Sequence, residues 1–181
     1  MSLPWLARVA SLAALIPLAA CATGADRAAD VVLAAAPIAS PDGKMAGDAQ
    51  IVARTSGDVV LKIAVRGLPG AGTHGIHLHA VGRCEGPGFT SAGAHLNPFG
   101  RQHGFDNPSG SHLGDLPNIQ VASDGTGTLE RSLGLDGVAI TAQLFDTDGT
   151  AVVLHATADD YRTDPSGNSG GRVACGVFAR R

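Results

Sequence analysis

The chain has 181 residues, with 25 glycines, only 4% aromatic residues and a formal net charge of −3 at pH 7. This length fits a single domain, and a mildly acidic chain without a basic stripe lacks the electrostatic footprint of a nucleic-acid-binding protein. Because aromatic residues are so few, a core has to be built mainly from Val, Ile, Leu and Ala, with a few Phe.

Residues 1–20 predict an export signal rather than a part of the fold. The amino terminus and Arg8 supply positive charge. The apolar run Val9–Ala20 that follows is too short to span a bilayer. The run ends in a sequence that resembles a bacterial lipobox, Leu18-Ala19-Ala20-Cys21. Cys21 is then the lipidated first residue of the mature chain, and residues 21–30 form a tether; ordinary cleavage after Ala20 or Ala22 is the alternative. Both interpretations place the domain outside the cytoplasm, and we expect a periplasmic lipoprotein that touches the membrane only through Cys21.

The remaining residues, 31–181, form one predicted domain of short strands. Alternating apolar residues between Gly and Pro turns are typical of half-buried strands. The expected strands cover 31–33 with Ile38, 49–54, 59–66, 74–81, 119–121, 128–130, 151–156 and 172–178. The Asp124-Gly125 turn predicts a hairpin between 119–121 and 128–130. No segment shows a convincing amphipathic helix, so the pattern favours an all-β sandwich or barrel.

The stretch from His74 to Asp115 contains six of the seven histidines. His77 and His79 lie two residues apart, so on a strand both imidazoles project from the same face and could hold one ion. The stretch from Arg83 to Pro117 has no strand or helix period, and a loop of that length is usually functional or disordered. Four further donors lie within it: His95, His103, His112 and Asp115.

Imidazole suits both zinc and copper, and these donors outnumber the ligands of one tetrahedral ion. The stretch therefore predicts two metal sites, or one site with spectator residues. Scattered histidines without a metal are the alternative.

Cys84 and Cys175 are the only cysteines besides Cys21. They can pair with each other in an exported protein, where disulfides persist. Two buried free thiols are the alternative.

Several motifs together resemble a bacterial copper/zinc superoxide dismutase, in family order and near family spacing from about residue 30 to the end. The matching pieces are Gly75-Ile76-His77-Leu78-His79, Thr90-Ser91-Ala92-Gly93-Ala94-His95, Asn97-Pro98, the H-x7-H-x8-H-x2-D spacing, Gly114-Asp115-Leu116, Val152-Val153-Leu154-His155, Ala158-Asp159-Asp160 and the segment 167–176. The resemblance implies an eight-stranded, immunoglobulin-like Greek-key barrel or sandwich. It also implies a long metal-binding loop and a shorter C-terminal active-site loop.

The resemblance further implies the cofactors and the site residues. It gives copper the ligands His77, His79, His95 and His155, and zinc the ligands His95, His103, His112 and Asp115. His95 would then bridge the two ions as an imidazolate. Asp159 would link a copper-site imidazole to a zinc-site imidazole, and Arg172 would draw the anionic substrate, superoxide, to the copper. The implied reaction is the dismutation of superoxide to oxygen and hydrogen peroxide.

Other residues near these motifs are expected to have lesser roles. His74 is expected to be structural, and Asp160 and Asp164 to be solvated loop acids. The segment between His155 and Arg172 lacks the acidic and lysine cluster that helps to steer superoxide in eukaryotic members, and Arg162 is a candidate substitute. A homodimer is compatible with the sequence, which does not fix the oligomeric state.

Two other functions remain open at this stage. One is a copper-binding or copper-buffering module on the same fold, which would have lost His155, Arg172 or the open copper site. The other is a disulfide-linked structural sandwich with an incidental zinc, which would not need His155 or the pair His77 and His79.

Overall fold

The computed structural model describes residues 29–68 and 70–181, so the predicted signal, Cys21 and most of the predicted tether lie outside the described residues. Within these ranges the chain forms ten strands, one α-helix and one 3-10 helix. In chain order they are β1 (Val31–Ala39), β2 (Met45–Ala53), β3 (Val59–Val65), β4 (Gly72–His74), β5 (Ile76–His79), the 3-10 helix η1 (Thr90–Ala92), β6 (Ile119–Val121), β7 (Gly127–Ser132), α1 (Gly137–Leu144), β8 (Ala151–His155), β9 (Arg172–Val177) and β10 (Ala179–Arg180).

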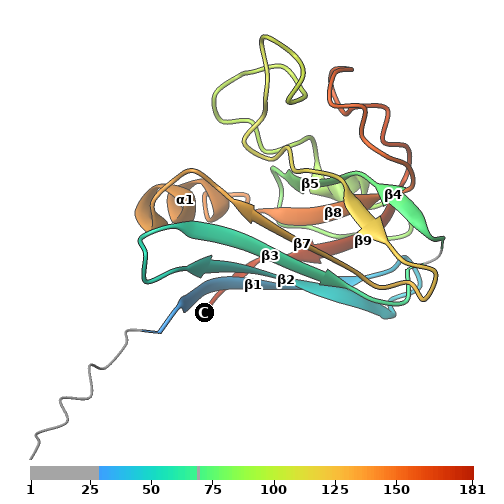
Figure 1. The fold of residues 1–181 in the computed structure, drawn as a ribbon, viewed down its shortest axis with the longest axis horizontal. Coiled ribbons are helices and arrows are strands. Elements are labelled where there is room, and N and C mark those ends of the chain that lie inside the picture. Colours follow the sequence, from blue (N-terminus) through green and yellow to red (C-terminus); the bar gives the residue numbers. More distant parts are fainter. Residues whose placement is uncertain (1–28, 69) are drawn as a thin grey trace, which may run out of the picture.

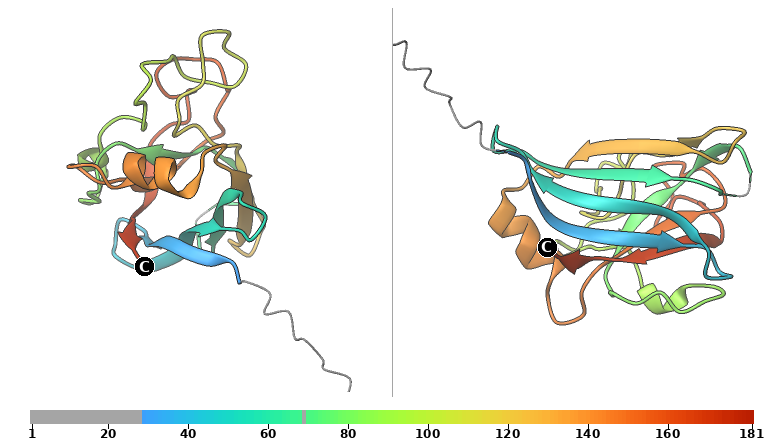
Figure 2. Two further views of the ribbon diagram at one scale, coloured as in Figure 1. Left: turned by 90° about the vertical axis from the view of Figure 1, so that its left-hand side faces the viewer. Right: turned by 90° about the horizontal axis from the view of Figure 1, so that it is seen from below.

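Eight strands form a single antiparallel sheet in the order β5-β8-β9-β1-β2-β3-β7, with β10 paired to β1 beside this path. The sheet curls over, so that β5 and β8 lie above the layer made by β1, β2 and β3 (Figures 1 and 2). A separate pair, β4 and β6, forms a small second sheet. The predicted all-β fold with eight strands is thus confirmed, as a curled half-barrel.

The core lies inside the curl and follows from the alternation of apolar residues. On β3, the side chains of Val59, Leu61, Ile63 and Val65 belong to one buried cluster, as expected for residues that share one face of a strand. From the opposite wall, Ile76 and Leu78 of β5 join the same cluster. Each fully buried Leu or Ile contributes about 1.5–3 kcal/mol to stability, so the two walls are held together mainly by aliphatic contacts.

The same alternation turns two histidines of β5 away from the core. His77 and His79 pair in register with Val153 and Ala151 of β8. Those two β8 residues belong to a second, smaller buried cluster on the outer face of the sheet. Both histidines are nevertheless buried, because a loop covers this face.

The strand predicted over 74–81 is interrupted, and this prediction was wrong in detail. β4 pairs with β6, whereas β5 pairs with β8 in the main sheet. Gly75 lies at the switch, where its N–H donates to Thr157 O and its carbonyl accepts from His155 N–H. His74, at the end of β4, contacts His155 O through Nδ1 (2.9 Å) and Gly70 O through Nε2 (3.2 Å).

Two further local predictions differ from the structure. The turn at Asp124-Gly125 forms, but its flanking strands do not make the expected hairpin, since β6 pairs with β4 and β7 pairs with β3. Helix α1 was not expected. Its N-cap, Asp136, accepts a hydrogen bond from Ala139 N at 2.7 Å, and Ile140 and Leu144 bury its inner side in the core. Among the described residues, no helix is long and apolar enough to cross a membrane.

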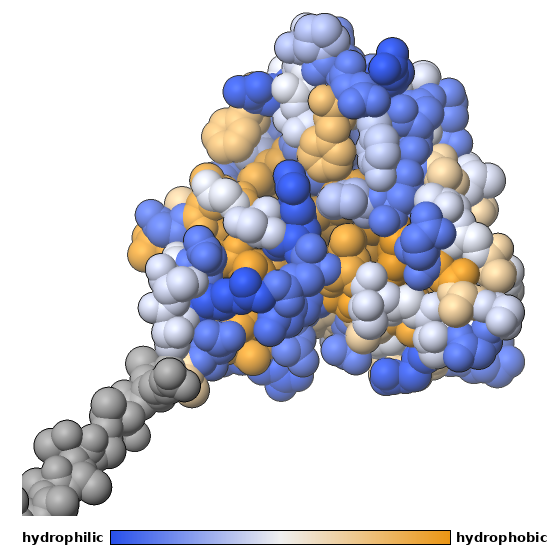
Figure 3. Space-filling model, in the orientation of Figure 1, coloured by the Kyte–Doolittle hydropathy of each residue, from blue (hydrophilic) through white to orange (hydrophobic). Residues whose placement is uncertain are grey.

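Two loops project together from one side of the sheet (Figures 1 and 2). The long loop comprises residues 80–118 and includes η1, and the C-terminal loop comprises residues 156–171. In the view of Figure 3 their surface is mostly hydrophilic, whereas apolar residues show across the middle of the same face. These loops correspond to the predicted long and shorter loops, and they meet over His77 and His79.

Candidate metal centre

Local backbone contacts bring the long loop onto the outer face of β5. His77 forms an isolated β-bridge with Asp115, and His79 forms one with His95. Gly114 makes this approach possible, because a Cβ there would collide with Leu78 O of β5. The strand therefore presents two histidines, and the loop brings His95 and Asp115 directly beside them.

Four buried imidazole nitrogens converge without a hydrogen-bond partner in the described part of the chain. They are His77 Nδ1, His79 Nε2, His95 Nε2 and His155 Nε2. Ligand atoms of these four residues all lie within 4.8 Å of one another. We call this group the four-histidine cluster.

The opposite nitrogen of each ring in this cluster has an oxygen acceptor. His77 Nε2 donates to Asp159 Oδ2 (2.7 Å), and His95 Nδ1 to Asp115 Oδ1 (3.0 Å). His79 Nδ1 donates to Gly93 O (2.9 Å), and His155 Nδ1 to Gly170 O (3.2 Å). Because these contacts place the ring proton on the outer nitrogen, each inner nitrogen carries a free lone pair.

Burial keeps these rings neutral. It lowers the pKa of His79 to about 2, of His155 to about 3 and of His95 to about 4, and it also lowers the pKa of His77. Metal binding needs neutral imidazole. Buried polar atoms without partners are rare and costly, so four converging lone pairs are chemically suited to a bound cation and to little else. A soft or borderline ion such as copper fits this all-nitrogen donor set.

A second group of donors lies on the other side of His95. Oδ1 of Asp115 is 3.0 Å from His95 Nδ1, 2.9 Å from His103 Nδ1 and 3.2 Å from His112 Nδ1. The Nδ1 atoms of His95 and His112 are 3.4 Å apart. One carboxylate oxygen and three imidazole nitrogens match the ligand types of a tetrahedral zinc site. We call this group the aspartate cluster.

A ligand atom of His77 also lies within 4.8 Å of those of His95, His103 and Asp115. The rings of His77 and His95 stack, with their centroids 3.9 Å apart. We assign His112 rather than His77 to the aspartate cluster, because His77 Nε2 is occupied by Asp159 and its Nδ1 belongs to the four-histidine cluster.

Asp115 in the aspartate cluster and Asp159 beside it set the protonation of the groups in this cluster. Burial alone would raise the pKa of Asp115, but hydrogen bonds from His103 and His95 outweigh it and hold the pKa well below its usual value. Burial alone would lower the pKa of His103, but hydrogen bonds to Asp115 and Asp159 raise it to about 9. A zinc ion at His103 Nδ1 would replace the proton that this ring shares with Asp115.

Asp159, from the C-terminal loop, joins the two clusters. Its Oδ2 accepts from His77 Nε2 (2.7 Å) and its Oδ1 from His103 Nε2 (3.0 Å). Gly167 lies against it, where a Cβ would collide with Asp159 Oδ1. Burial would raise the pKa of Asp159, but hydrogen bonds from His103 and His77 hold it below its usual range. Such carboxylates fix the tautomer and orientation of metal-binding histidines.

Asn118 holds Asp159 in place and was not singled out in the sequence. Its Nδ2 donates to Asp159 O (2.9 Å) and its Oδ1 accepts from Asp159 N–H (2.8 Å). It lies three residues after Asp115 and no spacing rule points to it, so only the fold reveals this role.

The four-histidine cluster opens onto a hollow of about 430 Å³ whose lining includes His79, His155, Ser166 and Arg172. The guanidinium of Arg172 is fixed, since Nη1 donates to Phe89 O and Nη2 to Gly93 O, both at 2.6 Å. Arg162 is not part of this lining, and its Nε lies 3.6 Å from Asp106 Oδ2 instead. Arg172 is therefore the cation that borders this hollow.

Cys84 and Cys175 form the predicted disulfide. It ties the long loop to β9, three residues beyond Arg172, and packs with Phe89 and Ala92 in the outer buried cluster. The bond thus braces the segment whose carbonyl groups hold the Arg172 guanidinium.

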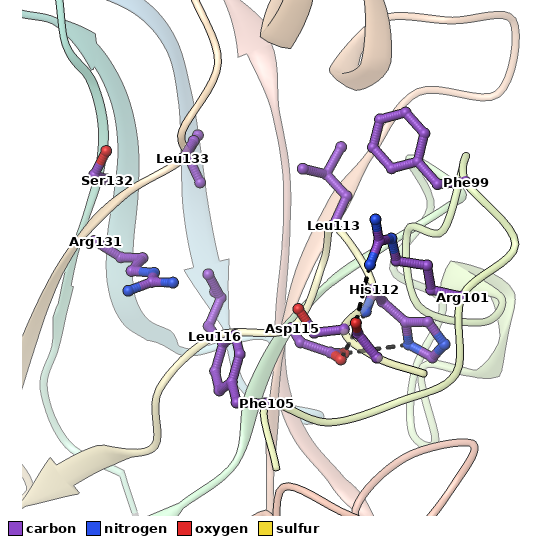
Figure 4. Close-up of a pocket in the computed structure, with 12 residues that line it drawn as sticks. Phe99, Arg101, Phe105, His112, Leu113, Asp115, Leu116, Arg131, Ser132 and Leu133 are labelled. Atoms are coloured by element: carbon purple, nitrogen blue, oxygen red, sulfur yellow. Dashed lines mark hydrogen bonds and ion pairs between the residues drawn. The ribbon is translucent and has the colours of Figure 1, made fainter. Parts of the chain in front are cut away.

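A second hollow, of about 310 Å³, lies beside the aspartate cluster (Figure 4). Arg101, Phe105 and Arg131 line it together with His112 and Asp115. It reaches none of the four unpartnered nitrogens, so it is separate from the hollow that leads to the four-histidine cluster.

Asp160 and Asp164 are both exposed, in agreement with the solvated loop acids that were predicted, and each also makes contacts within the loops. Asp164 Oδ1 accepts the main-chain N–H of His103 at 2.6 Å. Asp160 accepts the N–H groups of Arg162 (2.9 Å) and Thr163 (2.8 Å) and so organises its own loop.

Comparisons with known proteins agree with this geometry. Residues 45–178 match the family model described as copper/zinc superoxide dismutase. A protein of Caulobacter vibrioides named superoxide dismutase [Cu-Zn] is 42% identical over 149 residues, which are 80% of this chain and 84% of the relative. The crystal structure of a superoxide dismutase-like protein from Bacillus subtilis covers 79% of this chain and 96% of its own, at 35% identity and a TM-score of 0.72. The copper/zinc superoxide dismutase of Brucella abortus covers 82% of this chain and 98% of its own, at 26% identity and a TM-score of 0.62.

Proposed function

Because the chain belongs to the copper/zinc superoxide dismutase family, we propose that it converts two superoxide anions and two protons into oxygen and hydrogen peroxide outside the cytoplasm. The observation that carries this proposal is the four-histidine cluster. It contains four unpartnered lone pairs, and three of its histidines, His79, His95 and His155, line a hollow that is bordered by a fixed arginine.

The two clusters would hold two different ions. His77, His79, His95 and His155 would bind copper through their unpartnered nitrogens. His95, His103, His112 and Asp115 would bind zinc through Nδ1 and Oδ1 atoms. His95 belongs to both sets, with Nε2 directed to the first and Nδ1 to the second.

Copper supplies the one-electron redox couple that superoxide dismutation requires, and the surrounding residues supply the rest. Arg172 attracts the anion into the hollow and offers N–H donors to orient it. His95 can hold a proton on Nε2 while its Nδ1 stays in the aspartate cluster, and it can pass that proton to the reduced substrate. Asp159 keeps His77 in the tautomer that leaves Nδ1 free.

A copper-binding module without catalysis is the second candidate. A storage site gains nothing from access for a small anion, whereas the hollow beside His79 and His155 includes a guanidinium held by two hydrogen bonds. This arrangement favours an enzyme over a copper buffer. A structural sandwich with incidental zinc does not account for the four-histidine cluster.

We further propose that residues 1–20 are an export signal, that Cys21 carries a lipid, and that residues 21–30 tether the domain 31–181 to the membrane in the periplasm. The lipobox-like Leu18-Ala19-Ala20-Cys21 supports this, and so does the disulfide, since such bonds persist outside the cytoplasm. Mass spectrometry of the wild type and of Cys21→Ser tests the anchor. Lipid on the wild type alone is expected, and an unlipidated wild type would indicate ordinary cleavage.

The catalytic proposal is tested on the purified domain 31–181. We expect the metal-free domain to be inactive, zinc alone to give no activity, and copper added after zinc to give rapid superoxide dismutation. A fully copper-loaded domain that binds the metal tightly but leaves superoxide decay unchanged would favour the copper-buffering module.

A further inference from the structure

Asp164 lies in the C-terminal loop, at the point where this loop meets the long loop. Its carboxylate Oδ1 accepts the main-chain N–H of His103 at 2.6 Å. The same oxygen lies 3.9 Å from Nε2 of His112. One carboxylate oxygen therefore faces two residues of the aspartate cluster, through the backbone of one and the ring of the other.

The ring contact lies on the side of His112 that faces away from the other donors. His112 Nδ1 points to Asp115 Oδ1 (3.2 Å), so in the neutral ring that binds a cation through Nδ1 the proton is on Nε2. Histidines that bind metals usually direct this outer N–H to a carboxylate, a carbonyl or water, which orients the ring and raises its basicity. Among the described residues, Asp164 is the acid that lies within ion-pair distance of His112 Nε2.

The other two histidines of this cluster are supported differently. His103 directs Nε2 to Asp159 Oδ1 at 3.0 Å, and His95 directs Nε2 into the four-histidine cluster. Asp164 Oδ1 lies 3.9 Å from His112 Nε2, which is ion-pair distance and longer than a hydrogen bond. The backbone bond to His103 also fixes where that residue enters the cluster.

We propose that Asp164 is a positioning residue of the zinc site, which orients His112 through charge and His103 through its backbone. The next residues, Pro165 and Ser166, line the hollow that leads to the four-histidine cluster. Asp164 thereby connects the zinc ligands to the wall of the substrate hollow. This inference rests on the zinc site proposed above.

Two variants separate the two contacts of Asp164, and a third serves as the control. Asp164→Asn keeps a carbonyl oxygen for His103 N–H but removes the negative charge near His112, whereas Asp164→Ala removes both. Asp106→Ala is the matched control, because it breaks the contact between Asp106 and Arg162, which joins the same two loops without touching a zinc ligand.

The measurements are zinc affinity by competition with a chelator, and the visible spectrum of Co²⁺ bound in place of zinc. Asp164→Ala should weaken zinc binding by about tenfold, at the lower end of the usual effect of losing a partner of a metal ligand, because the hydrogen bond to the His103 backbone is lost and the half-exposed carboxylate lies 3.9 Å from His112 Nε2. Asp164→Asn should lose less affinity but still shift the cobalt bands, because the ligand field of His112 changes. Asp106→Ala should stay within about twofold of the wild type, since exposed ion pairs contribute little. Circular dichroism establishes that each variant is folded.

Wild-type zinc affinity and an unshifted cobalt spectrum in both Asp164 variants would overturn the inference. So would an equal loss of affinity in Asp106→Ala, because the effect would then come from general loosening of the loops. A wild type that binds no zinc would instead overturn the proposed two-metal site on which the inference depends, and this outcome is recognised before any variant is measured.

Discussion

Asn118 and Asp159 are joined by two hydrogen bonds that run in opposite directions. The Asn118 side chain donates to the carbonyl of Asp159 (2.9 Å) and accepts from its N–H (2.8 Å). The backbone of Asp159 is thereby fixed, and its two carboxylate oxygens reach one histidine in each cluster. Asn118 thereby holds a carboxylate that contacts both the four-histidine cluster and the aspartate cluster.

We expect Asn118→Ala to weaken zinc binding by about tenfold and to lower the free energy of unfolding of the metal-free protein by about 1–3 kcal/mol. The reason is that two partly buried backbone groups of Asp159 lose their partners. Gln120→Ala, which removes a bond to Thr73 at the exposed surface, is the control and should change neither quantity. Unaltered zinc affinity and stability in Asn118→Ala would show that Asp159 is held by other contacts.

Arg172 is expected to set the rate at which the anionic substrate arrives. The chain carries a net charge of −3, so the overall field repels superoxide, whereas the fixed guanidinium attracts it. Local focusing of this kind changes association rates by roughly 10- to 1,000-fold. Arg172→Ala should therefore lose about tenfold in rate at low ionic strength, and Arg172→Glu more, with both metals still bound.

Salt provides the second readout for Arg172. The wild-type rate should fall as ionic strength rises, because salt screens the attraction, and the rate of Arg172→Ala should fall less steeply. Arg162→Ala is the control, since Arg162 contacts Asp106 and does not line the hollow. If fully metallated Arg172→Glu dismutates superoxide at the wild-type rate in low salt, Arg172 does not attract the substrate and has only a structural role.

The Cys84–Cys175 bond should contribute to stability and to the shape of the site. It closes a segment with a sequence separation of 91, for which chain entropy gives about 4.6 kcal/mol. Reduction, or the Cys84→Ser variant, should lower the melting temperature and speed hydrogen exchange in the long loop. The copper site should then hold its ion less tightly, because Phe89 and Gly93, whose carbonyls position Arg172 and His79, lie in that loop.

Cys21→Ser serves as the control for the disulfide, since Cys21 lies outside the predicted domain and should leave melting and exchange unchanged. A reduced protein with the same melting temperature and the same exchange rates as the oxidised one would contradict a bracing role.

Much of the fold could be predicted because apolar residues recur at every second position in several segments between turns. On β3, apolar residues at every second position specify one buried face. The failures are local. The pattern continues through Gly75, so a strand that switches partner there looks uninterrupted in the sequence. Helix α1 contains β-branched residues and buries only Ile140 and Leu144, so its apolar pattern is too weak to indicate a helix. The structure reveals the hydrogen bond by which Asp136 caps its N-terminus.

The candidate site also has a part that could be predicted from the sequence and a part that could not. The histidines between His74 and Asp115 outnumber the ligands of one ion, which indicated metal binding, and the family resemblance divided the donors into two ligand sets. Residues that hold the histidines in place are ordinary polar residues in loops, as Asn118 and Asp164 show. Their importance depends on contacts between segments far apart in the chain, and no local pattern records such contacts.

The most direct test of the central claim is the superoxide dismutation rate of the zinc-loaded domain during titration with copper. We predict that the rate rises in proportion to bound copper and levels off at one copper and one zinc per chain. His155→Ala, which lacks one unpartnered nitrogen of the four-histidine cluster but leaves the aspartate cluster intact, should keep its zinc and lose the activity. A domain that binds one copper and one zinc yet decomposes superoxide no faster than its copper-free form would contradict the account.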